Sequence, residues 1–236
     1  MHQQKLKSSS LDIGEILYIT LDILTEKWKT LLLILIIINF PLLLVGQLMP
    51  NHPISYSFWI IIYAVFTTLE WLALLVLTEK TILDEKVDAN LALKRGFYKL
   101  RTLLVNLLVM WVIYFIFVGF GLILFIIPGI YIAITHYFFS ETIALRNASF
   151  FDSFQYSRNL VEGNFCKVLL LAFLATTTSG NLVTPSNFLP ELPVLEAMLI
   201  IIIKLFLNFI FYIIRIVITV SFLNLDYVKN GLPSRV

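Results

Sequence analysis

The chain has 236 residues, of which 59% are hydrophobic and 14% are charged, and its mean hydropathy is +0.92. Soluble domains carry about 25% charged residues, so this composition excludes a soluble globular protein and predicts an integral membrane protein. The net charge of +2 comes from basic residues that flank apolar segments, which is unlike the single basic patch of a nucleic-acid-binding protein. A single cysteine, Cys166, excludes an intramolecular disulfide and a cysteine-based zinc site.

Long charge-free runs predict transmembrane helices, because about 20 apolar residues are needed to cross a hydrocarbon core of about 30 Å. The first two predicted spans are residues 30–49 and 57–77. Residues 102–140 contain no charge, and at about 1.5 Å per residue they are about twice as long as the membrane is thick. We therefore expect two spans folded back as a hairpin, with the turn between Gly119 and Gly129.

The fifth predicted span begins at Val168, and the sixth covers residues 193–226. Each pair of spans follows a segment with apolar residues at helical spacing, namely residues 11–28, 88–101 and 149–163. Such segments are typical of helices that lie in the membrane interface, although any helix that enters a bilayer obliquely shows a similar pattern.

The predicted fold is an all-α polytopic membrane protein with six transmembrane helices and three cytoplasmic interfacial amphipathic helices. Residues 1–236 form a single integral membrane domain of three tandem units, each a surface helix followed by a hairpin. The units are residues 11–78, 79–145 and 146–228, between a flexible N-terminus (1–10) and a C-terminal tail (229–236).

The basic residues predict how these spans are oriented. The chain has 17 Lys and Arg residues, and all of them except Lys204 and Arg215 fall in four places. These are before span one, between spans two and three, between spans four and five, and after span six. The alternate connections contain none. Cytoplasmic loops are enriched in basic residues, so both termini are expected in the cytoplasm.

Polar residues inside the predicted spans are candidates for a functional site, because they are costly in lipid. Lys204, Asn208 and Arg215 share one face of span six. Glu70 and His136 lie at a depth similar to that of Arg215, and Glu141 lies closer to the surface, near headgroups or Arg146. We expect Arg215 to reach Glu70, with His136 nearby. This arrangement is consistent with a structural ion pair, with a proton or anion site, or with side chains that merely extend toward the surface.

No catalytic motif is present: the chain has no His-Glu-x-x-His pair, no Gly-x-Ser-x-Gly turn and no phosphate-binding glycine loop. The three histidines, His2, His52 and His136, are expected in different compartments or depths. We therefore predict no catalytic residue, no metal and no cofactor.

Several short motifs resemble a bacterial membrane-protein family. They are the segments at residues 13–17 and 39–41, the Ile127-Pro128-Gly129-Ile130-Tyr131 run, residues 162–165 and the terminal Leu225-Asp226-Tyr227. The family contains the membrane domain of some glycerophosphodiester phosphodiesterases and the YciC-like integral membrane proteins of unknown function. The resemblance implies a bacterial plasma (inner) membrane location. The soluble phosphodiesterase domain is absent, so its activity does not carry over.

Three functions remain open from the sequence. The first is a non-enzymatic integral membrane protein that organises or assists other envelope components. Its partners would be the lipid bilayer and other membrane proteins or lipids, and no nucleic acid. The second is a small transporter or lipid-handling protein built around the intramembrane polar residues, and the third is an intramembrane enzyme. A continuous cavity that reaches Glu70, His136 and Arg215 favours transport, and a packed interior favours the first function.

The orientation is testable by cysteine labelling in a Cys166-free background. A cysteine placed by Asn51→Cys or Asn187→Cys is expected to react with an impermeant maleimide added to intact cells. One placed by Asn90→Cys is expected to react only after permeabilisation. Labelling of the Asn90→Cys variant in intact cells would contradict the predicted orientation.

Overall fold

The computed structural model describes residues 6–7, 9–48, 53–124, 126–179 and 194–231, and every described element from Ile13 onward is an α-helix. The all-α prediction is therefore confirmed for this part of the chain. The helices are α2 (Ile13–Leu48), α3 (Pro53–Ile82), α4 (Ala89–Leu124), α5 (Ile126–Thr135), α6 (Phe139–Arg146), α7 (Phe150–Val161), α8 (Phe165–Ser179) and α9 (Val194–Asn230).

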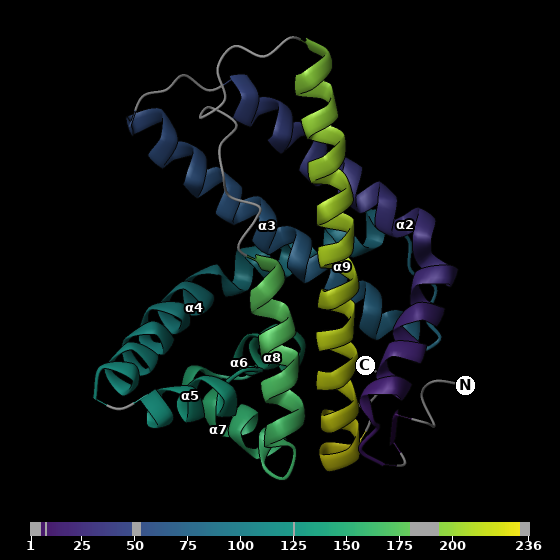
Figure 1. Cartoon of the computed structure of the whole chain (residues 1–236). Helices are drawn as coiled ribbons and strands as arrows, with labels where there is room; N and C mark the ends of the chain where they lie inside the picture. The colour runs from purple at the N-terminus through teal and green to yellow at the C-terminus, as the bar shows by residue number, and fades with distance from the viewer. Residues whose placement is uncertain (1–5, 8, 49–52, 125, 180–193, 232–236) are drawn as a thin grey trace.

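Within the described residues, three helices, α2, α3 and α9, are long and apolar enough to cross a membrane. They do so over Ile13–Val45, Phe58–Ile82 and Ile201–Asn230, each of which contains an apolar stretch of sufficient length. They contact one another, and α9 runs through the middle of the molecule beside α2 and α3 (Figure 1). Leu33, Ile36 and Ile37 on α2 are about half exposed, which fits lipid contact better than water contact. The chain is therefore a membrane protein.

Two of the three predicted surface helices are not separate elements. Residues 13–28 continue without a break into the first predicted span as α2, and residues 89–101 continue into the third as α4. No glycine or proline lies at either junction, so nothing interrupts the backbone hydrogen bonds. At its start α4 is capped by Asp88, whose Oδ1 accepts a hydrogen bond of 2.9 Å from the Leu91 amide.

The third predicted surface helix is a separate element, α7. Ser149 precedes it in an extended conformation, and Gly163 follows it with φ of 82°. A positive φ is easy for glycine and strained for other residues, so Gly163 allows the chain to leave α7 and begin α8 two residues later.

The predicted hairpin in residues 102–140 is formed by α4 and α5, which lie side by side (Figure 1). The hydroxyl of Tyr114 donates to the carbonyl of Ala133 at 3.1 Å between the two arms. One helix ends at Leu124 and the next begins at Ile126, so the break lies between Gly119 and Gly129 as predicted. These two glycines lie inside helices, however, and are not themselves the turn.

The second arm of this hairpin is shorter than predicted. Helix α5 has 10 residues, so it is only about 15 Å long, about half of the hydrocarbon core. A turn at residues 136–138 separates it from α6. Ser157 of α7 stabilises that turn, because its Oγ accepts from the Phe138 amide at 3.0 Å and donates to the Thr135 carbonyl at 3.2 Å. One side chain thus satisfies two backbone groups that the break leaves without helical partners.

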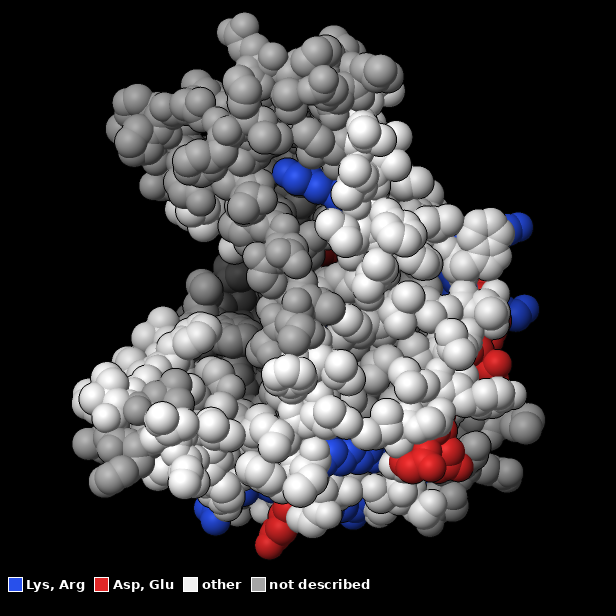
Figure 2. Space-filling model, viewed as in Figure 1, with Lys and Arg blue, Asp and Glu red and all other residues white. Residues whose placement is uncertain are grey.

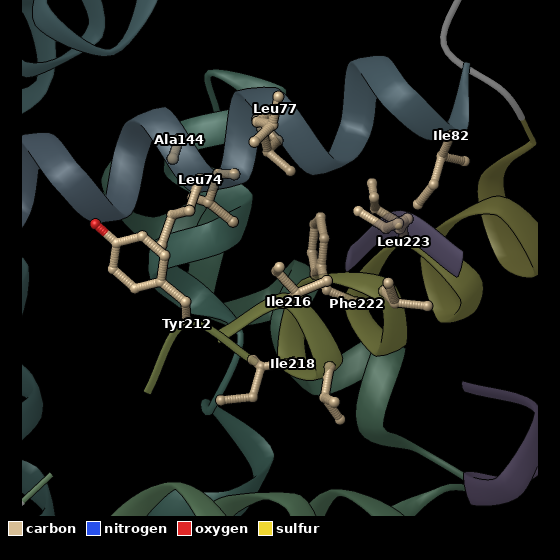
Figure 3. Packing of buried hydrophobic residues seen from close by; sticks show 14 of the residues in the cluster. Leu74, Leu77, Ile82, Ala144, Tyr212, Ile216, Ile218, Phe222 and Leu223 are labelled. Carbon is tan, nitrogen blue, oxygen red and sulfur yellow. The ribbon is translucent and has the colours of Figure 1, made fainter. Parts of the chain in front are cut away.

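The hydrophobic core is formed mainly by α2, α3 and the second half of α9. Figure 3 shows Leu74 and Leu77 of α3 near Ile216 and Phe222 of α9. Every residue from Ile216 to Tyr227 is buried, so this half of α9 is enclosed by protein on all sides.

At one end of the molecule, the start of the described chain packs against the C-terminal part of α9. Asn224 of α9 accepts from the Leu11 amide at 3.0 Å and donates to the carbonyls of Leu6 and Ser9. Leu6, Ser9 and Leu11 are thus held against α9. Most charged side chains visible in Figure 2 lie in the lower half of the view, toward this end.

Helix α4 approaches the backbone of α3 closely at Gly96. A Cβ atom at this position would lie 3.0 Å from the backbone nitrogen of Ala73, whereas one at Gly119 of the same helix would meet nothing within 4 Å. We expect Gly96→Val to lower the free energy of unfolding by about 1–3 kcal/mol, because α3 must move away. Gly119→Val is the matched control and should be nearly neutral. Equal losses in thermal unfolding in detergent would show that the approach of α3 to α4 does not matter.

Candidate functional site

The buried polar groups in the membrane-spanning part meet at Glu70. This residue lies in the apolar part of α3 and is only 7% exposed. Its Oε1 accepts hydrogen bonds from the Asn39 amide group of α2 and from the Tyr212 hydroxyl of α9. The carboxyl group therefore joins all three helices that are long enough to span a membrane.

Asn39 extends this network to a fourth side chain. Its Oδ1 accepts a hydrogen bond of 3.0 Å from Asn208 of α9, while its Nδ2 donates to Glu70. Asn208 lies one helical turn before Tyr212, so both face α2 and α3 from the same side of α9. We call Asn39, Glu70, Asn208 and Tyr212 the three-helix polar cluster.

Arg215 does not form the direct ion pair with Glu70 that we predicted. Among the described residues, no carboxylate makes an ion pair with its guanidinium, which lies over the ring of Phe211 at 4.7 Å. It interacts electrostatically with Glu141, Tyr137 and Glu70. The direction of the side chain around the helix could not be predicted from spacing, and Tyr212 occupies the position beside Glu70.

Glu141 also differs from the prediction. It is 4% exposed in α6 and accepts a hydrogen bond of 3.0 Å from Ser140, so it neither reaches headgroups nor binds Arg146. The break between α5 and α6 explains this placement, because α6 turns inward and brings Glu141 toward Arg215.

His136 lies away from the cluster. Its Nδ1 is 2.9 Å from the Ile132 carbonyl and 3.0 Å from the Thr135 hydroxyl, and its ring packs edge-on against Phe154 of α7. Lys204 is half-buried on α9, one turn before Asn208. Of the six predicted site residues, the structure thus places Glu70 and Asn208 in one hydrogen-bonded group, and Arg215 and Glu141 interact next to it.

Two members of the cluster were missed in the sequence. Tyr212 is enclosed completely and looks like one more aromatic residue in an apolar helix. Asn39 is an amide in the middle of the first apolar run, and a polar residue in such a run is the sequence signal that could have identified it. In the structure its side chain is buried, with 3% exposed.

A second polar cluster lies at the charged end and is centred on Arg146. Its Nη1 is 2.6 Å from Glu79 of α3, and its Nε and Nη2 are 2.6 and 2.5 Å from Oδ2 of Asp226 on α9. The other oxygen of Asp226 accepts from the Tyr156 hydroxyl of α7 and from Asn230. This Arg146 cluster therefore joins α3, α6, α7 and α9.

The electrostatics of this cluster favour the charged form of the arginine. Burial by itself lowers the pKa of Arg146, but the carboxylates of Asp226 and Glu79 outweigh it and raise that pKa above its usual range. The guanidinium also lies 5.9 Å from the ring centre of Phe222 and 5.8 Å from that of Tyr227. From the sequence, Arg146 served only to predict the orientation of the spans, and no pattern indicated that it pairs with Glu79 and Asp226.

No group of three or more His, Cys, Asp or Glu residues suited to a metal occurs in the part of the chain that the structure describes. No family model, curated protein or solved structure matches the chain. The resemblance to the phosphodiesterase membrane domain therefore stays a prediction.

The Arg146 cluster generates a stability prediction. Arg146→Met should lower the free energy of unfolding by about 3 kcal/mol, because two buried carboxylates lose their partner. The double variant Arg146→Met with Asp226→Asn should lose less than the sum of the two single losses. The measurement is thermal unfolding in detergent, with Arg95→Met on the exposed face of α4 as the control. Additive losses would mean that Arg146 and Asp226 do not stabilise each other.

Proposed function

We propose that this protein is a non-enzymatic integral membrane protein that organises or assists other components of a bacterial envelope. The observation that supports this proposal is the state of Glu70. Its carboxyl group is committed to Asn39 and Tyr212, and it is buried among apolar residues. A carboxyl group that takes part in transport or catalysis needs a path to solvent along which protons or ligands are exchanged. A carboxyl group that only ties helices together needs no such path.

We further propose that α4, α5 and α8 also enter the bilayer, so that the six segments expected from the sequence lie in it, with α5 reaching only part of the way across. Apolar side chains along these helices are strongly exposed, including Phe120 and Ile123 of α4, Ile127 of α5 and Phe173 of α8. Exposed Phe and Ile at this density are stable in lipid and unstable in water. Both termini are proposed to be cytoplasmic, and the membrane is proposed to be a bacterial plasma membrane.

The partners are then lipids or other membrane proteins, contacted through exposed helix faces. The amphipathic helix α7 has Phe151 at 80% exposure, close to charged residues that are expected at the cytoplasmic surface. An exposed Phe beside charged groups is typical of a helix that docks against a membrane surface or another protein.

A flux assay tests the proposal. Protein reconstituted in liposomes that contain a pH-sensitive dye should conduct no more protons under an imposed gradient than protein-free liposomes do. Glu70→Gln protein should give the same trace as the wild type. A sustained proton flux that Glu70→Gln abolishes would contradict the proposal and favour the transporter.

Photocrosslinking tests the organising role. A photoreactive residue at Phe151 should yield a discrete protein adduct in native membranes, and the same residue at Ile123, which is 82% exposed on the expected lipid-facing hairpin, should not. Identical lipid-only adducts at both positions would show that α7 does not dock a protein.

A further inference from the structure

A pocket outside the three-helix polar cluster lies where α5, α7 and α8 meet. Its volume is about 270 Å³, and it is lined by Tyr131, Thr135, Arg158, Glu162, Gly163 and Phe165. None of its lining residues takes part in either polar cluster, so it is not explained by the helix packing described above.

The pocket contains two opposite charges that do not neutralise each other. Arg158 and Glu162 are four residues apart, and the amide of Glu162 donates to the carbonyl of Arg158 at 3.0 Å. Both side chains are exposed, and neither forms an ion pair or a side-chain hydrogen bond among the described residues. Residues at this spacing have Cβ atoms about 5–6 Å apart, and both residues line the pocket.

The other wall of the pocket is aromatic. The rings of Tyr131 on α5 and Phe165 on α8 stack with centres 5.9 Å apart. Beyond them, Ile127 and Ile130 of α5 and Leu169 and Phe173 of α8 are exposed apolar residues. The pocket thus has charged groups on one side and leads to an apolar surface on the other, as does the boundary between headgroups and acyl chains.

We propose that this pocket binds the headgroup of a zwitterionic phospholipid that carries a primary amine. Arg158 takes the phosphate, for which a guanidinium offers two parallel N–H donors. Glu162 takes the ammonium group, which has three N–H donors and no acceptor. The acyl chains leave past Tyr131 and Phe165 along the apolar faces of α5 and α8.

The charge pair selects among headgroups. The carboxylate of Glu162 repels a headgroup that has a net negative charge and no amine, and this repulsion opposes binding of that headgroup. A quaternary ammonium has no N–H to donate to a carboxylate and favours an aromatic cage, which the single stacked pair at Tyr131 and Phe165 does not form. A primary ammonium next to a phosphate matches both charges.

This inference goes beyond the proposed organising function and does not depend on it, because the pocket is built from α5, α7 and α8 alone. It is tested with the full-length protein in detergent by native mass spectrometry, with phosphatidylethanolamine, phosphatidylcholine and phosphatidylglycerol added at equal concentration. The wild type should retain phosphatidylethanolamine in preference to the other two lipids. Equal retention of all three, or a preference for phosphatidylglycerol, would overturn the proposal.

Two variants separate the roles of the charges. Arg158→Gln should weaken retention of phosphatidylethanolamine about tenfold, which corresponds to about 1.4 kcal/mol. Glu162→Gln should abolish the preference over phosphatidylcholine while leaving phosphatidylcholine retention unchanged. Arg95→Gln, at an exposed position on α4, is the matched control and should bind as the wild type does. Equal losses in Arg158→Gln and Arg95→Gln would show a non-specific charge effect and reject the site.

A competition arm distinguishes a lipid from a soluble phosphate compound. Phosphoethanolamine and inorganic phosphate at millimolar concentration should not displace the lipid, because they lack the acyl chains that contact α5 and α8. Displacement by either compound at that concentration would identify a site for a free phosphate ligand and would reject the lipid assignment. Thermal unfolding of each variant ensures that a loss of binding is read only from folded protein.

Discussion

The structure depends on one constraint: a polar group inside an apolar helix bundle must find its partner on another helix. No water in the bilayer core can take the place of that hydrogen-bond partner, and a polar group without a partner costs several kcal/mol. Glu70 meets this constraint through Asn39 and Tyr212, and Asn208 extends the network. Packing of leucine against isoleucine does not select one orientation of a helix in lipid, because lipid chains are as apolar as these side chains. The hydrogen bonds of the three-helix polar cluster are directional, so they fix the rotation of α2, α3 and α9 about their axes.

The same requirement explains the charged end. Arg146 of α6 holds Glu79 and Asp226, and through Asp226 it reaches Tyr156 of α7. Asn224 meanwhile ties Leu6, Ser9 and Leu11 to α9. The two sets of polar contacts secure α9 at two heights, and the buried apolar segment from Ile216 to Phe222 lies between them (Figure 3). A helix held at two heights supports the proposed organising function better than a transport function in which the helix moves. The pocket between α5, α7 and α8 is separate from both sets of contacts.

Local features of the fold were predictable from the sequence, and the pairing of distant side chains was not. The cap at Asp88 and the stop at Gly163 depend on neighbouring residues, so residue type was sufficient to place them. The separation of α5 from α6 depends on Ser157, 19 residues beyond Phe138, and no local pattern indicates it. The helical rise predicts similar depths for Glu70 and Arg215, but it does not predict their partners. Rotation about a helix axis decides which group is met, and Tyr212 rather than Arg215 faces the carboxyl group of Glu70.

The most direct test of this account is the coupling energy between Asn39 and Glu70 in thermal unfolding in detergent. The cycle compares Asn39→Leu, Glu70→Leu and the double variant, with Phe40→Leu at an exposed position of α2 as the control partner for Glu70→Leu. The account predicts that the double variant loses less stability than the sum of the single losses, by about 0.6–1.7 kcal/mol, as for interhelical hydrogen bonds in membranes. It also predicts no coupling between Phe40 and Glu70. Additive losses for Asn39 and Glu70 would contradict the claim that the three-helix polar cluster holds the bundle together.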